Sequence, residues 1–229
     1  MEIRFLGHAA FEITDGDARI LIDPFLAPDN PAAAVGADEV EPTHILLTHG
    51  HSDHTAHAVA VAKRTGAKCV AIVEIAQWLS EQGVEDVEDP NLGGTIELEW
   101  GWVKLVPAFH TSTLPDGRAI GISAGLVLGI GQTTVYHLGD TALFGDLRLI
   151  AERTPVDVAL IPIGGHYTMD QHDAVTAAEL IDAGTVIPMH YNTFPPVEAD
   201  PERFKADVEA SSQTSSEVVI LKPGESFNP

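Results

Sequence analysis

The chain has 229 residues, 45% of them hydrophobic, which is typical of a globular protein with a substantial core and excludes a disordered chain. No apolar run is long enough to span a membrane, and 34 acidic against 12 basic residues give a net charge of −22, which disfavours nucleic acid as a partner. The single cysteine, Cys69, cannot form an internal disulfide, and the N-terminus lacks the pattern of a secretory signal, so we expect a cytoplasmic protein.

The first half of the chain predicts strands alternating with helices. EIRFLGHAAFEI (2–13) and ARILIDPF (18–25) are two β-prone runs joined by the turn TDGD, which predicts a hairpin. A short buried strand, THILLTH (43–49), precedes a helix over 54–66 that ends at a glycine. A strand over 68–74 and a helix over 75–83 follow.

The second half begins with four consecutive β segments and then returns to alternation. The expected strands are 95–100, 102–109, 119–129, 133–139, 156–164, 185–190 and 217–224, and the expected helices are 142–153, 169–184 and 201–210. This mixture predicts an α/β protein whose sheets are covered by helices in layers, and we expect one domain over residues 1–229.

Polar residues follow several of the predicted strands. Because strand ends meet at one edge of a sheet, we expect one site there, assembled from His49, His110, Asp140, His166 and His190.

The stretch THGHSDHTAH (48–57) holds four histidines and one aspartate. A compact loop after the strand could turn His49, His51, Asp53 and His54 inward, with Asp53 as the cap of the next helix. Imidazole and carboxylate are zinc ligands, and four donors exceed what one catalytic zinc needs, so two adjacent metals are the simplest interpretation. His110, Asp140 and His190 could complete the ligand sets.

The motif HGHSDH resembles the His-x-His-x-Asp-His signature of the metallo-β-lactamase superfamily. The later positions His110, Asp140 and His190, the segment LIDPF and the opening FLGHAAFEI are also similar, so the resemblance covers nearly the whole chain. It is strongest to the short metal-dependent hydrolases of that superfamily, and weaker to its ascorbate-phosphate lactonase and N-acyl-phosphatidylethanolamine phospholipase D branches.

This resemblance implies a four-layer αββα sandwich with a dinuclear site at one edge. Metal 1 would be held by His49, His51 and His110. Metal 2 would be held by Asp53, His54 and His190, and Asp140 would bridge the two ions. The expected cofactors are therefore two divalent ions, first of all Zn²⁺, with Mn²⁺ or another ion as the alternative.

The ligand set predicts hydrolysis by a hydroxide that bridges the two metals, with Asp53, Asp140 and His166 as catalytic residues. Two ions, two carboxylates and one hydroxide leave a formal charge of +1, which favours a small, anionic ester, lactone or phosphodiester as substrate. The sequence leaves assembly into a homo-oligomer open.

Several polar residues outside the ligand set have two interpretations. Asp23, and less strongly His8, could support a ligand by hydrogen bonding, or serve only in turns. His166 could donate a proton to the leaving group, or be an exposed loop residue. Arg118 could contact a phosphate, although a solvated turn is the simpler reading. The remaining histidines are expected to be structural: His44, His57, His137 and His172.

Two other functions remain open at this point. A nuclease or RNA-processing enzyme of the same fold would need a basic patch, and the sequence has none. The second is a non-catalytic metal-binding protein of the same fold. Seven candidate ligands around an open site argue against it, because metal binding alone would not require them.

Overall fold

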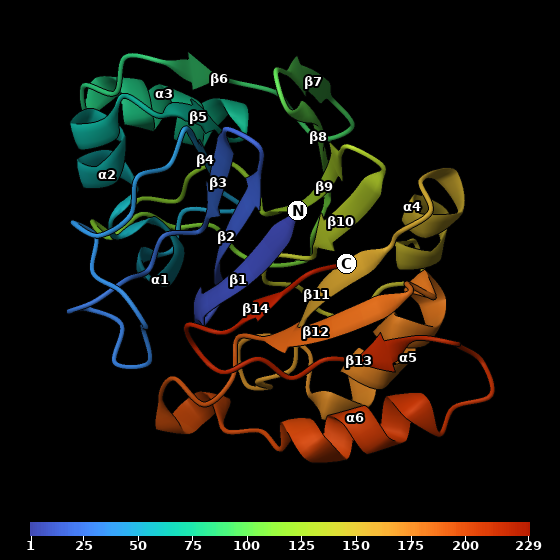
Figure 1. Ribbon diagram of the computed structural model, residues 1–229. Coiled ribbons are helices and arrows are strands. Elements are labelled where there is room, and N and C mark those ends of the chain that lie inside the picture. The colour runs from blue at the N-terminus through green and yellow to red at the C-terminus, as the bar shows by residue number, and fades with distance from the viewer.

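Two seven-stranded mixed sheets lie at the centre of the protein, and helices cover their outer faces (Figure 1). The structure is a computed structural model that describes residues 1–229. Helices α1–α3 lie beside the first sheet, and α4–α6 lie beside the second. The layered α/β architecture expected from the sequence, a helix-covered pair of sheets, is therefore confirmed.

The first sheet has the strand order β14-β1-β2-β3-β4-β5-β6. Its strands are β1 (Glu2–Gly7), β2 (Ala10–Asp15), β3 (Ala18–Ile22), β4 (His44–Leu46), β5 (Lys68–Val70), β6 (Val87–Glu88) and β14 (Ser226–Phe227). Strands β14 to β3 pair antiparallel, whereas β3 to β6 pair parallel. The parallel part brings the ends of β3 and β4 to the same edge.

The second sheet has the order β13-β12-β11-β10-β9-β8-β7. Its strands are β7 (Thr95–Leu98), β8 (Gly101–Pro107), β9 (Ala124–Ile130), β10 (Thr133–His137), β11 (Val158–Pro162), β12 (Thr185–Met189) and β13 (Glu217–Val218). Strands β7 to β10 are antiparallel, as four consecutive β segments require, and β10 to β13 are parallel.

The helices are mostly shorter than the sequence predicts. They are α1 (Ser52–Thr55), α2 (Ala58–Thr65), α3 (Val73–Glu81), α4 (Leu147–Arg153), α5 (Gln171–Ile181) and α6 (Pro201–Glu209), with a 3₁₀ turn at Pro195–Val197. The prediction of a single helix over 54–66 is wrong, because a turn at Ala56 and His57 separates α1 from α2. The strand expected over 68–74 ends at Val70, and α3 already begins at Val73, within that range.

The N-terminal region also differs from the prediction. The run 2–13 is not one strand but two, because Gly7 and His8 have φ angles of 115° and 60° and turn the chain back on itself. Only glycine adopts the conformation of Gly7 without strain, and an added Cβ there would lie 2.8 Å from the carbonyl oxygen of Ala32. This turn places His8 at the edge of the sheet where the candidate ligands lie.

Buried apolar side chains form two clusters. The larger contains residues of both sheets, such as Phe11 and Leu126, and therefore joins the sheets to each other. The smaller packs the second sheet against its helices through residues such as Ile161, Ala177 and Phe204. Each fully buried large apolar side chain contributes about 1.5–3 kcal/mol, so both clusters hold the edge of the sandwich in place.

Cys69 lies in β5 and is fully buried, and burial raises the pKa of its thiol to about 12. It is therefore a core residue, as expected, and an unreactive one. None of the helices combines the length and the apolar character that a membrane crossing requires.

Candidate metal centre

The candidate ligands come from loops that follow strands of both sheets. His49 follows β4, and His51, Asp53 and His54 lie at or within the short helix α1. The other three follow β8, β10 and β12 of the second sheet: His110, Asp140 and His190. The prediction that Asp53 caps the following helix is wrong, because His51 occupies the cap position and Asp53 lies in the first turn.

Three imidazoles form the first group of ligand atoms. His49 Nε2 lies 3.0 Å from His51 Nδ1, which lies 3.3 Å from His110 Nε2. Zn–N bonds of about 2.0–2.1 Å in tetrahedral geometry separate two nitrogen ligands by roughly 3.3 Å, so this spacing fits one ion. The remaining nitrogens of two rings contact hydroxyls, at 2.9 Å from Thr48 Oγ1 to His49 Nδ1 and 3.0 Å from Thr113 Oγ1 to His51 Nε2.

A second group contains four residues whose ligand atoms lie within 4.8 Å of one another: His8, Asp53, His54 and His190. Asp53 Oδ2 lies 4.0 Å from His190 Nε2 and 3.1 Å from His8 Nε2. Three of these four residues belong to the expected ligand set for metal 2, and His8 is the addition.

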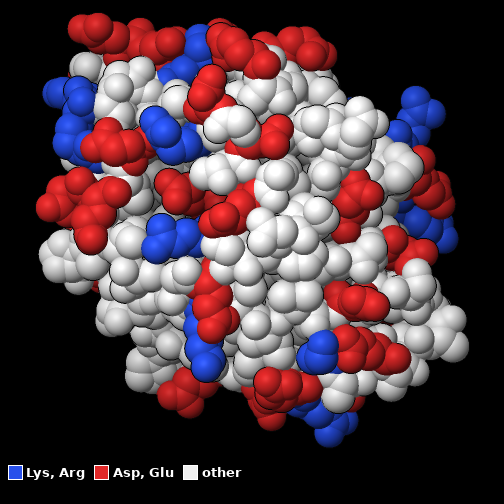
Figure 2. Space-filling model, viewed as in Figure 1, with Lys and Arg blue, Asp and Glu red and all other residues white.

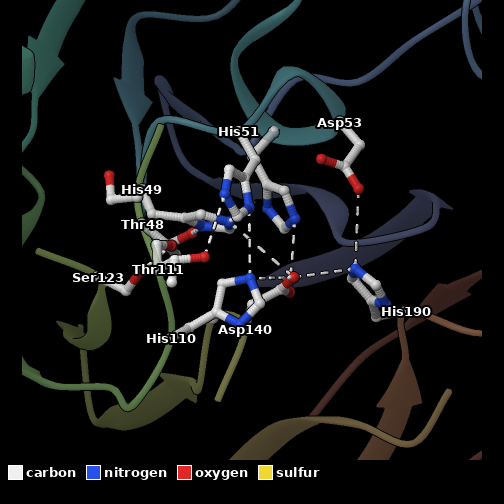
Figure 3. Close-up of polar contacts among 12 residues, drawn as sticks. Thr48, His49, His51, Asp53, His110, Thr111, Ser123, Asp140 and His190 are labelled. Atoms are coloured by element: carbon white, nitrogen blue, oxygen red, sulfur yellow. Dashed lines mark hydrogen bonds and ion pairs between the residues drawn. The ribbon is translucent and has the colours of Figure 1, made fainter. Parts of the chain in front are cut away.

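Asp140 lies between the two groups, and Figure 3 shows its carboxylate among the imidazoles of His49, His51, His110 and His190. Its carboxylate oxygens are 3.0 Å from His190 Nε2 and 3.4 Å from His54 Nε2. They are also 3.6 Å from His110 Nε2 and 3.9 Å from His49 Nε2. One carboxylate thus reaches histidines of both groups, which is the position of a bridging ligand.

Buried polar atoms without a hydrogen-bond partner gather at the same place. They include His54 Nε2, Asp140 Oδ1 and both ring nitrogens of His190. A buried polar atom left unpaired costs about 1–3 kcal/mol, and three of these atoms, His54 Nε2, His190 Nε2 and Asp140 Oδ1, are possible metal ligands that lie close together. The residues present therefore fit a divalent cation.

Burial and charge also set the protonation states. Burial lowers the pKa of His49 well below its usual value, which keeps its ring neutral. Burial alone would raise the pKa of Asp140, but His190 and His54 outweigh it and hold the pKa well below the usual range. A neutral imidazole and an ionised carboxylate are the forms that bind metals.

Asp23 fixes one candidate ligand by hydrogen bonding, which is the first of the two interpretations that the sequence left open. Its fully buried carboxylate accepts bonds from Thr48 N at 2.8 Å, Thr48 Oγ1 at 2.6 Å and His54 Nδ1 at 2.7 Å. His54 therefore carries its proton on Nδ1 and directs the lone pair of Nε2 toward Asp140.

His8 has a comparable place beside Asp53. Its Nε2 donates to Asp53 Oδ2, its Nδ1 lies 2.8 Å from Thr193 Oγ1, and its ring centroid is 3.9 Å from that of His190. The sequence did not reveal the hydroxyls of Thr113 and Thr193, because a threonine distant in sequence carries no signal of the imidazole it contacts. Thr48 precedes its partner His49 directly, and it was missed because its role depends on a tertiary contact with Asp23.

His166 lies outside both groups. It is exposed, has a φ angle of 49°, and its ring packs edge-on against Tyr167 with centroids 4.5 Å apart. The structure therefore brings together seven of the eight candidate site residues. His166 is the exception, although its neighbour Tyr167 lines the cleft that opens onto the cluster.

The histidines expected to be structural have partners elsewhere or lie in solvent. His137 Nε2 donates to the carbonyl of Ala9 at 2.9 Å, and His57 Nδ1 accepts from the amide of Leu26 at 3.2 Å. His44 lies 3.0 Å from Thr43 Oγ1, and His172 is exposed.

A cleft of about 620 Å³ opens onto the cluster. Four candidate ligands line it, together with apolar or aromatic side chains and two hydroxyl residues. Its lining residues are Phe25, His51, Ser52, Asp53, His110, Thr111, Asp140, Tyr167, Phe194 and Pro196. Arg118 does not line this cleft; it is exposed and lies 3.8 Å from Asp116.

The buried state of His8 predicts how stability depends on pH once metal is removed. Burial lowers the pKa of His8 to about 4, whereas a histidine in the unfolded chain titrates near 6.5. Between these values the unfolded state binds more protons, so stability is full above pH 6.5 and falls as the pH falls toward 4. We expect His8 to account for a loss of up to about 3 kcal/mol, measured by urea unfolding of chelator-treated protein. His8→Gln should flatten this dependence, and His172→Gln, at an exposed site, should not; equal curves for both variants would contradict the prediction.

Comparison with known proteins gives a consistent result. Residues 2–190 match the sequence profile of the Beta-lactamase superfamily domain. A UPF0173 metal-dependent hydrolase of Methanopyrus kandleri is 50% identical over 230 residues, covering 99% of both chains, and one of Thermus thermophilus is 47% identical over 225 residues, covering 98% of this chain and 97% of its own. Among solved structures, a metallo hydrolase of Ignicoccus hospitalis has a TM-score of 0.89 at 36% identity, covering 99% of this chain and 98% of its own. A metallo-beta-lactamase fold protein of Bacillus subtilis shares the fold, with a TM-score of 0.75 at 16% identity over 99% of both chains.

Proposed function

Because the chain belongs to the beta-lactamase superfamily and, within it, to the UPF0173 metal-dependent hydrolases, we propose that it cleaves a small ester, lactone or phosphodiester with two divalent ions. The protein is a metal-dependent hydrolase of the metallo-β-lactamase fold. The number of ions, their identity and the substrate are parts of the proposal. So is a single hydrolase domain over residues 1–229, supported by ligands that come from both sheets.

The observation that carries the two-ion proposal is the position of Asp140 between the two ligand groups. In the proposal, His49, His51 and His110 hold one ion, Asp53, His54 and His190 hold the other, and Asp140 contacts both. Imidazole and carboxylate donors favour zinc, with manganese as the alternative. The buried cysteine supports a reducing compartment such as the cytoplasm as the place of action.

The residues of this chain orient and protect the reacting groups. When bound, two divalent ions would lower the pKa of a shared water and polarise the scissile group. Thr48, Asp23 and His8 hold ligand rings or carboxylates in fixed directions by the hydrogen bonds described above. The cleft beside the cluster has room for a substrate, and the aromatic and apolar residues of its lining would limit the access of water to the bound molecule.

A nuclease is the less well supported alternative. Acidic side chains are spread over the face shown in Figure 2, and its basic side chains lie among them. A nucleic-acid site would need a continuous basic surface. Salt-dependent binding of RNA by the metal-loaded protein would favour this alternative over a small substrate.

The proposal predicts two metal ions per chain. Protein purified without chelator should contain close to two equivalents of zinc, manganese or another divalent ion by elemental analysis, because two ligand groups surround Asp140. It should also hydrolyse an activated ester such as p-nitrophenyl acetate, and lose that activity on chelation. A single bound equivalent that does not rise on titration with zinc would contradict the two-ion proposal.

We extend the proposal to His166 as the proton donor to the leaving group, since its neighbour Tyr167 lines the cleft. A general acid contributes ~10²–10⁴-fold to the rate. His166→Ala should therefore keep its metal content and lose turnover in this range on an alkyl ester. The loss should be smaller on a p-nitrophenyl ester, whose leaving group needs little protonation. Parental rates on both esters would leave His166 as an exposed loop residue.

A further inference from the structure

The cleft beside the metal cluster combines candidate ligands with aromatic and apolar side chains. Besides His51, Asp53, His110 and Asp140, its lining contains Phe25, Phe194, Tyr167 and Pro196, and only two other residues, Ser52 and Thr111. A substrate whose scissile bond lies at the cluster therefore places most of its remaining atoms near aromatic or apolar groups.

Two aromatic rings of the cleft lining, those of Phe25 and Phe194, pack against a histidine of the cluster. The His8 ring lies 5.6 Å from the ring of Phe25 and 5.3 Å from that of Phe194, measured between centroids. The two phenylalanine rings are 6.4 Å apart. Tyr167 is different, because 53% of it is exposed at the mouth of the cleft. Two rings are thus fixed, and the third is free to contact a bound molecule.

The lining residues contain no lysine or arginine. The ionisable groups among them are the carboxylates of Asp53 and Asp140 and the imidazoles of His51 and His110, whose pKa values burial lowers. Sites for phosphate or carboxylate groups use arginine, lysine or converging backbone amides. An anionic group placed away from the ions would here find no cationic side chain, only aromatic carbon and the hydroxyl residues Ser52 and Thr111, so burying it is costly.

We infer that the substrate is an uncharged carboxylic ester, lactones included, that carries an apolar or aromatic group beside its carbonyl. This inference rests on the proposed hydrolase function, and it replaces the anionic substrate expected from the formal charge of the ions. Water adds its oxygen to the carbonyl carbon, the bond from that carbon to the alkoxy oxygen breaks, and the alkoxy oxygen takes up a proton. The products are a carboxylic acid and an alcohol. Phe194 and Tyr167 are the residues that determine specificity for the apolar group.

The first test compares substrates with one leaving group on the metal-loaded protein. The probes are p-nitrophenyl acetate, p-nitrophenyl phenylacetate and bis-p-nitrophenyl phosphate, each rate divided by that of the uncatalysed reaction in hydroxide. We expect kcat/KM for the phenylacetate to exceed that for the acetate by roughly tenfold or more, as for an aromatic group bound in an apolar pocket. A normalised preference for the phosphodiester, or equal values for both esters, would overturn the inference.

Variants locate the preference in the cleft. Phe194→Ala and Tyr167→Ala should each reduce the ratio of phenylacetate to acetate by roughly tenfold, mainly through KM, and Tyr167→Phe should restore it. Leu149→Ala, at an exposed apolar residue of α4 that lines another cavity, should leave the ratio unchanged. Because Tyr167 is exposed, its replacement should not destabilise the fold. The test therefore remains valid even if Phe194→Ala lowers the melting temperature. An unchanged ratio in Tyr167→Ala together with well-folded Phe194→Ala would overturn the assignment.

A binding experiment separates this inference from the proposed function. Saturation-transfer NMR on chelator-treated protein should detect binding of methyl phenylacetate, weaker binding of it in Tyr167→Ala, and no binding of phenyl phosphate. Binding of methyl phenylacetate without turnover by the metal-loaded protein would contradict the proposed hydrolysis and support the aromatic subsite. Turnover of esters together with equal binding of both probes would support the proposed hydrolase function and contradict the inference of an uncharged substrate.

Discussion

Asp140→Ala is expected to reduce turnover of the metal-loaded protein by about 10³-fold or more and to leave at most one tightly bound ion per chain. The reason is that this carboxylate contacts histidines of both ligand groups, so its loss removes a ligand from each proposed ion at once. Elemental analysis and kcat on an activated ester measure the two effects.

The fold should survive this replacement, because Asp140 lies after the end of β10 and its partners are other site residues. Circular dichroism of the variant should therefore match that of the parent. Asp146→Ala, six residues further along and exposed, is the matched control and should retain both ions and full turnover. Full turnover by well-folded Asp140→Ala would exclude the bridging role.

Asp23→Ala should cause the largest loss of stability among the site residues, about 3–5 kcal/mol of unfolding free energy, or a fall in Tm of roughly 10 °C. Its carboxylate accepts three hydrogen bonds in a fully buried position, and all three donors would lose their partner. The φ angle of 46° adds strain for alanine. Thermal unfolding of chelator-treated protein measures the effect without a contribution from metal.

Two further variants give this prediction its controls. Asp23→Asn keeps one acceptor oxygen and tolerates positive φ, so it should lose clearly less stability than Asp23→Ala. Asp157→Ala removes an exposed aspartate that also accepts a backbone amide, at 2.7 Å from Thr134, and should change stability by less than about 1 kcal/mol. In metal-binding assays Asp23→Asn should weaken affinity by about 10–100-fold, because His54 loses part of its orientation. A Tm of Asp23→Ala equal to that of Asp157→Ala would contradict the prediction.

The sequence predicted the ligand cluster because its chemistry is local. His49, His51 and His54 lie close together in a motif of metal-binding residue types, and His110 and His190 each follow a strand of strong β pattern. The layered architecture followed from the same alternation of strands and helices.

The sequence could not predict contacts that depend on tertiary structure. The turn at Gly7 and His8 interrupts a continuous β-prone run, and only the approach of the Ala32 backbone explains the need for a glycine there. The hydroxyls that hold the imidazoles come from positions as distant as Thr193, where no local pattern exists. His166 shows that a position after a strand is not enough to predict a site residue. Like His190, it follows a strand of the second sheet, but its side chain is exposed and lies outside the cluster.

The amide of His190 donates to the carbonyl oxygen of His8 at 2.7 Å, so residues from opposite ends of the chain meet at the cluster. During synthesis, strands β1 to β6 can emerge from the ribosome long before this partner exists. At about 5–20 residues per second, the nascent protein spends several seconds with His49, His51 and His54 exposed and their final neighbours still untranslated. Such a segment is expected to bind metal weakly, because the cost of ordering its backbone is not yet met by the rest of the fold. We therefore expect stable binding of metal only after the segment that carries His190 has been made.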